Sequence, residues 1–75
     1  MLVTAGGVTI TLPSAATVGS GVVIYVKDRD GNAQSDNITV EGAGAETIDG
    51  SLTYTLSTDY QSATFLSDGT NWSLI

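Results

Sequence analysis

Carboxylates are the side chains of this sequence best suited to chemistry. Asp28 and Asp30 are followed by Gly31 and Asn32, a spacing similar to the start of a calcium-binding loop. Calcium takes about six to eight oxygen ligands, and a complete loop has glycine at its sixth position and a bidentate glutamate at its twelfth. Here the glycine is fourth and the twelfth residue is Thr39. The pattern therefore favours a turn held by Asp and Asn hydrogen bonds, and no metal or cofactor is expected.

Paired acids could also serve a glycosidase, which holds two carboxyl groups across a sugar. However, Asp49, Asp59 and Asp68 all lie in turn sequences, where aspartate is common because its side chain bonds the local backbone. The chain has no His and no Cys, so a Ser–His–Asp triad and thiolate chemistry are excluded. A Ser–Lys pair would depend on Lys27 alone. The sequence predicts that the protein is not an enzyme.

Aromatic side chains offer a second kind of candidate site. Trp72 and Phe65 are expected to pack in the core or at a subunit interface, where large rings contribute most per residue. Tyr54 and Tyr60 are expected to pack as well. Because aromatic rings can stack on sugars, an alternative hypothesis is a glycan-binding surface that uses Tyr54, Tyr60 or Trp72.

Charge and length narrow the classes of partner. Lys27 and Arg29 are the only cationic side chains and the net charge is −6, which argues against nucleic acid and against anionic membranes. No segment approaches the roughly 20 apolar residues of a membrane span, so no membrane insertion is expected. Residues 1–75 form one domain at most. Met1 precedes a strand-like segment, which suggests a start codon placed before a fragment of a longer protein.

Small size predicts self-association. A domain of this length buries only about 60% of the surface that its unfolded chain exposes. Such domains usually gain stability from disulfides, a bound metal or oligomerisation. The absence of Cys excludes disulfides, and the absence of Cys and His excludes thiolate and imidazole metal sites. Copies of the same chain are the remaining compensation, although size alone gives no copy number.

Alternating apolar and polar residues predict short β-strands and an all-β fold, described as a sandwich, barrel or prism-like arrangement. Strands are expected at residues 8–12, 22–26, 38–40, 54–56, 60–67 and 71–75, with one helical turn at 14–17. The 22–26 segment is apolar on both faces, so it is expected to be central or covered on both sides. The last strand has no charged side chain to shield it, and neighbouring copies are expected to cover it.

Three Asp-Gly pairs lie nineteen residues apart, at Asp30-Gly31, Asp49-Gly50 and Asp68-Gly69. Asp-Gly favours tight turns because glycine accepts positive φ and aspartate tolerates it. The pattern favours a β-meander of similar strands, and three copies of one ancestral hairpin are the alternative. The last pair predicts a hairpin between the two closing strands. Core and interface residues are expected at Val8, Ile10, Leu12, Val22, Ile24, Val26, Ile38, Val40, Ile48, Leu56, Phe65, Leu66 and Trp72.

Five segments in order resemble a module of bacteriophage tail fibres, tailspikes and related virion appendages. The resemblance covers about Thr4 to Ile75, and its parts are Val8–Ala15, Ile24–Asp28 with Gly31-Asn32, Asn37–Val40, Glu46–Gly50 and Leu66–Trp72. It implies an antiparallel-rich, intertwined or closely packed homotrimer that joins neighbouring fibre modules and stabilises the fibre. It also implies a location in the virion after synthesis in the host cytoplasm. The alternative within the same resemblance is a host-surface glycan-binding tip.

Overall fold

The computed structural model describes Met1 to Ile75 and consists mostly of β-strands. The strands are β1 (Leu2–Val3), β2 (Thr9–Thr11), β3 (Ser20–Asp28), β4 (Ile38–Glu41), β5 (Thr53–Leu56), β6 (Ser62–Asp68) and β7 (Trp72–Leu74). One helical turn, α1 (Ala15–Val18), follows Pro13 and links β2 to β3. No helix has the length needed to cross a membrane.

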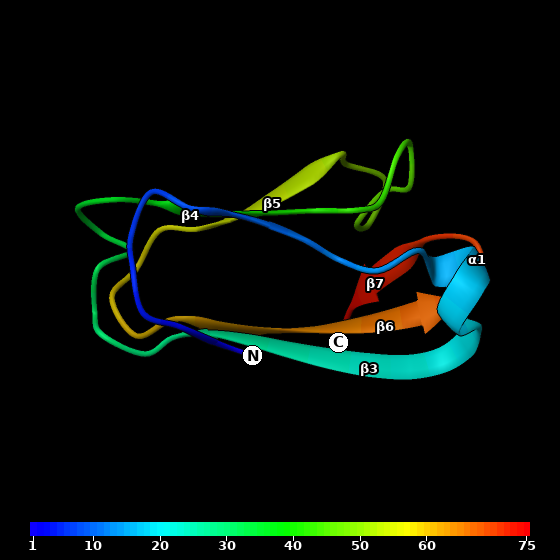
Figure 1. Ribbon diagram of the computed structural model, residues 1–75, viewed down its shortest axis with the longest axis horizontal. Coiled ribbons are helices and arrows are strands. Elements are labelled where there is room, and N and C mark those ends of the chain that lie inside the picture. Colours follow the sequence, from blue (N-terminus) through cyan, green and yellow to red (C-terminus); the bar gives the residue numbers. More distant parts are fainter.

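The strands form two mixed sheets. The four-stranded sheet has the order β1-β3-β6-β7, and the three-stranded sheet has the order β2-β4-β5. Figure 1 shows them as two layers, with β4 and β5 above β3 and β6 and with α1 at one end. In each sheet one pair is parallel, β1 with β3 and β2 with β4, and the other pairs are antiparallel.

The β-meander expected from the Asp-Gly spacing is wrong. The turn at Asp30-Gly31 leads from β3 in one sheet to β4 in the other. Asp49-Gly50 forms a small turn inside the connection between β4 and β5, where Ile48 and Ser51 exchange two backbone hydrogen bonds. Only Asp68-Gly69 joins adjacent strands, as the closing hairpin of β6 and β7. Local turn signals mark where the chain bends, whereas strand pairing is decided by which faces are buried together.

The core lies between the two layers. Of the thirteen expected core or interface residues, eight are buried within the single chain: Leu12, Val26, Ile38, Val40, Ile48, Leu56, Phe65 and Trp72. Four more are half-buried against that core: Val8, Ile10, Val22 and Ile24. Val3, Ala15, Ala33 and Ala63 complete the buried apolar cluster.

Leu66 has a different environment from the other twelve. Because successive side chains of a strand point to opposite faces, Leu66 and its neighbour Phe65 cannot both face the core. Phe65 is fully buried, whereas Leu66 is half-buried on the outer face of the four-stranded sheet, opposite Val23 of β3. The expectation of a core position for Leu66 is therefore wrong, and an interface position stays a prediction.

Strand β3 is central in its sheet, as expected from its apolar sequence, but it is covered on one side only. Val26 points inward and is buried, while Val23 and Tyr25 point outward and are exposed. No other part of the chain covers that outer face.

The free edge of β7 is covered by the chain itself. The backbone of Thr47 accepts the N–H of Trp72, and the N–H of Asp49 donates to the carbonyl of Trp72. The side chain of Asp49 accepts the N–H of Leu74. The edge of this strand therefore does not need a neighbouring copy, contrary to the expectation from its uncharged sequence.

Candidate functional site

Asp28, which ends β3, is a buried carboxylate that joins two loops. Its Oδ2 atom accepts the backbone N–H of Ala33 at 2.9 Å and that of Tyr60 at 3.1 Å. The loop after β3 is thereby fixed to the turn between β5 and β6. This arrangement accounts for the Asp-rich sequence at residues 28–32 as a structural junction.

The surroundings of Asp28 suit an anion and oppose a bound cation. Burial raises its pKa, but the backbone N–H groups of Ala33, Asn32, Tyr60 and Gly31 together hold the pKa below its usual value. These donors present partial positive charge, which would repel a calcium ion. The structure brings together no three acidic side chains that could hold a metal.

The other aspartates considered as catalytic acids bind the backbone. Asp49, Asp59 and Asp68 each accept N–H groups of nearby segments, at distances from 2.7 to 3.2 Å. For Asp68, the N–H groups of Asn71 and Thr70 lower the pKa. The surface has no pocket in which two of these acids could flank a substrate.

Glu46 is a structural carboxylate that the sequence did not reveal. Its Oε1 accepts the backbone N–H of Ala15 at 2.8 Å, and its Oε2 accepts the hydroxyl of Ser14 at 2.9 Å. The N–H of Ala15 is the main cause that lowers the pKa of Glu46. Ser14 occupies the N-cap position of α1 but makes no capping hydrogen bond with its own side chain, and Glu46 takes that role from far along the chain. No local sequence signal could have indicated a contact of this range.

The three aromatic residues proposed for glycan binding lie in different environments. Trp72 is buried and its indole N–H donates to the carbonyl of Pro13 at 3.2 Å. Tyr54 is half-buried and meets Phe65 edge-on, with ring centroids 6.0 Å apart. Only Tyr60 is exposed. The structure therefore does not place two of these rings side by side on an outer groove.

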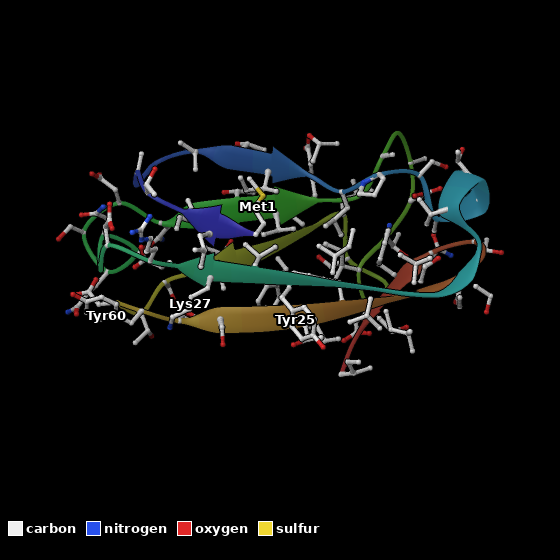
Figure 2. The ribbon with its side chains drawn as sticks, turned by 60° about the horizontal axis from the view of Figure 1, so that its bottom comes forward. Met1, Tyr25, Lys27 and Tyr60 are labelled. Carbon is white, nitrogen blue, oxygen red and sulfur yellow. The ribbon has the colours of Figure 1, made fainter.

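Tyr60 stands at the end of the four-stranded sheet, beside Lys27 (Figure 2). The Lys27 ammonium donates to the Tyr60 carbonyl at 2.7 Å and lies 6.0 Å from the centre of the Tyr60 ring. The ring also packs against Gly31, where a side chain would collide with it. The Lys27 ammonium and the Tyr60 ring are thus held at this end of the sheet.

The outer face of the four-stranded sheet carries exposed apolar side chains among polar ones. Val23 opposes Leu66, Tyr25 opposes Thr64, and Leu2 of β1 lies beside Lys27. Leu2 is 58% and Tyr25 is 64% exposed, and Figure 2 shows Tyr25 on this side of the molecule. The apolar sequence of residues 22–26 predicted a strand that is central or covered on both sides, and so did not single out this exposed surface.

The outer face of the three-stranded sheet is polar. Its paired positions form two rows across the strands, and five of the six residues are threonines: Thr9, Thr39 and Thr55 in one row, and Thr11, Glu41 and Thr53 in the other. The Thr11 hydroxyl donates to the Glu41 carboxylate at 2.7 Å. This face can remain in water because it exposes polar side chains and little apolar surface.

No protein-family model and no curated protein matches the sequence. The contrast between one apolar and one polar outer face is therefore the strongest pointer to function in the molecule. An apolar sheet face without a covering layer is typical of a surface that binds another protein chain.

Proposed function

We propose that this chain is a structural, non-catalytic module that trimerises and stabilises a bacteriophage tail fibre or tailspike. The observation that carries the proposal is the apolar surface that a single chain leaves uncovered. Six large apolar or aromatic side chains are more than half exposed: Met1, Leu2, Tyr25, Leu52, Tyr60 and Ile75. In this proposal the two sheets form a small sandwich, and further copies of the chain complete its burial.

The size of the core supports association. Twelve buried residues form the apolar cluster of the chain, and three of them are alanines with little area to bury. With about 25 cal/mol gained per Å² of buried apolar surface, a cluster this small leaves a marginal fold. Burial against other copies adds stability without a disulfide or metal.

The order of the fibre-like segments supports the choice of a virion fibre among homo-oligomeric proteins. These segments contribute to β2, β3, β4, the turn at Asp49-Gly50 and the closing hairpin. The module would lie in the virion after synthesis in the host cytoplasm, in contact with adjoining fibre modules. The alternative of a glycan-binding tip has less support, since Tyr60 alone of its three residues is exposed.

Mass measurement tests the proposal directly. Light scattering of the purified chain at micromolar concentration is expected to give three times 7.7 kDa. Because assembly stabilises the folded state by mass action, the melting temperature should rise by several degrees over a hundredfold increase in concentration. A stable species of 7.7 kDa whose melting does not depend on concentration would overturn the proposal.

A further inference from the structure

We propose that copies of this chain meet through the outer face of the four-stranded sheet, with Tyr25 at the centre of the contact. This inference rests on the proposed trimer and identifies its interface. The surface, called here the β3–β6 face, consists of Leu2, Val23, Tyr25, Lys27, Ser62, Thr64, Leu66 and Ser73.

The apolar side chains of the β3–β6 face are contiguous. The cross-strand pair Val23 and Leu66 lies next to the pair Tyr25 and Thr64, because both pairs follow the same register between β3 and β6. Leu2 extends the apolar surface across β1. Directly opposed residues on one face of an antiparallel pair are near neighbours. These side chains therefore form one continuous surface and are not separate exposed residues.

Charge favours a second copy of the chain as the occupant. Each copy has a net charge of −6, so a shared interface is most stable where carboxylates are absent. The middle of the β3–β6 face contains none: Asp68 lies on the same side only at the end of β6, and Lys27, at the opposite end, donates to the Tyr60 carbonyl. The opposite sheet, in contrast, has Glu41 at the end of its central strand, and copies that met there would bring like charges together.

Area is compatible with three copies. Each sheet extends along the longest and shortest axes of the molecule, 33 and 16 Å, so one face covers roughly 500 Å². Three such faces around one axis would bury roughly 1,500 Å² in total, divided among three pairwise contacts of roughly 500 Å² each. Two faces alone would bury roughly 1,000 Å², at the lower limit for a specific contact.

Tyr25 is the side chain best placed to anchor the contact. Its ring is the largest on the face, it is 64% exposed, and small side chains on β6 leave it standing above the sheet. Tyrosine is enriched among the residues that dominate binding energy, because a rigid ring gives a large contact area at low entropic cost.

A matched pair of substitutions tests the surface. Tyr25→Glu adds a carboxylate to the β3–β6 face, and Thr55→Glu adds one at an exposed strand position of the opposite sheet. By light scattering and sedimentation, Tyr25→Glu is expected to raise the dissociation constant of the trimer at least tenfold, whereas Thr55→Glu should leave the wild-type mass unchanged. Circular dichroism of both variants reports whether the strands remain folded.

Cross-linking gives a second test, in which the substitution adds no charge to the proposed interface. The chain has no native Cys, so Tyr25→Cys introduces a single thiol. A short bismaleimide is expected to link Tyr25→Cys chains covalently and to leave Thr55→Cys chains unlinked. Linking of the Thr55→Cys chains alone would place the interface on the other sheet.

The outcomes separate the interface from the proposed function. A monomeric wild type overturns the trimer and with it the proposed function. A trimeric wild type that tolerates Tyr25→Glu and gives no Tyr25→Cys cross-link overturns only the β3–β6 face. A wild-type dimer that Tyr25→Glu dissociates supports the face and contradicts the trimer.

Discussion

Among single residues, Asp28 shows how a side chain that could take part in a reaction can instead hold the backbone in place by hydrogen bonds. Its carboxylate is buried and accepts N–H groups from two separate loops. An ionised acceptor strengthens such bonds, because charge-assisted hydrogen bonds are roughly twice as strong as neutral ones. The consequence is that the two connections that run between the sheets, β3–β4 and β5–β6, are held at a single point.

Asp28→Asn is expected to destabilise the protein. The amide oxygen can still accept both N–H groups at the Oδ2 position, but the new NH2 group would be buried at the Oδ1 position, which has no hydrogen-bond partner. We expect the melting temperature to fall by roughly 10 °C at fixed protein concentration, measured by circular dichroism. Asp30→Asn removes the same charge from an exposed neighbour and serves as the control. Equal melting temperatures for the two variants would contradict the structural role of Asp28.

Sequence patterns indicate a residue's place only where the strand alternates cleanly. Phe65 and Trp72 are buried in the core, as their expected role in packing requires. Leu66 was grouped with Phe65 because both are apolar, although adjacent residues of a strand face opposite sides. Glu46 gave no signal at all, since its partners Ser14 and Ala15 lie about thirty residues earlier.

Among the elements, the connection from β4 to β5 has the tightest backbone approach. A Cβ atom on Gly42 would lie 2.4 Å from the carbonyl oxygen of Glu46. The small residues at 42–45 therefore allow the chain to fold back, and this bend brings the Glu46 side chain to α1. The Gly-Ala-Gly-Ala sequence of this segment is typical of such a bend, because glycine permits a close backbone approach.

Gly42→Ala is expected to lower the free energy of unfolding by about 2–3 kcal/mol, because the added methyl group collides with backbone that cannot move aside cheaply. Gly21→Ala is the control: it meets nothing within 4 Å, and its cost is limited to positive φ. That cost is about 1 kcal/mol. Urea denaturation followed by circular dichroism measures both. A Gly42→Ala variant as stable as Gly21→Ala would show that the bend can relax.

Strand positions could be predicted from the sequence, whereas their pairing could not. The segments at 22–26, 38–40 and 54–56 all fall within observed strands. The pairing of β1 with β3, however, joins Leu2 to Lys27 in parallel, and no local pattern encodes a partner at that distance. The same holds for β2 and β4. The expected antiparallel-rich arrangement is realised as two mixed sheets, in which three of the five strand pairs are antiparallel.

For the whole molecule, three carboxylates couple stability to pH. Asp28, Glu46 and Asp68 each have a pKa lowered in the folded state. A group with a depressed folded pKa contributes stability above its unfolded pKa, and this stability is lost as the pH falls through the folded value. The protein should therefore lose stability in acid, beginning near the ordinary pKa values of 3.8 and 4.5.

Melting at different pH values tests this coupling. We expect a melting temperature about 5–10 °C lower at pH 3 than at pH 7, and little change between pH 6 and 8, since the chain has no His to titrate there. The double variant Glu46→Gln, Asp68→Asn should show a smaller acid loss, because two of the three groups no longer titrate. Wild type and double variant with the same acid loss would contradict the assignment.

The two parallel pairs also have a consequence for biosynthesis. At about 5–20 residues per second, β1 and β2 leave the ribosome well before their partners β3 and β4. The other central strand of the larger sheet, β6, begins only at Ser62, near the end of the chain. The nascent chain thus cannot close its interior during translation, and folding must wait for release of almost the whole module. Chains on neighbouring ribosomes of one messenger would then reach a foldable state one after another, close to other copies of the same chain.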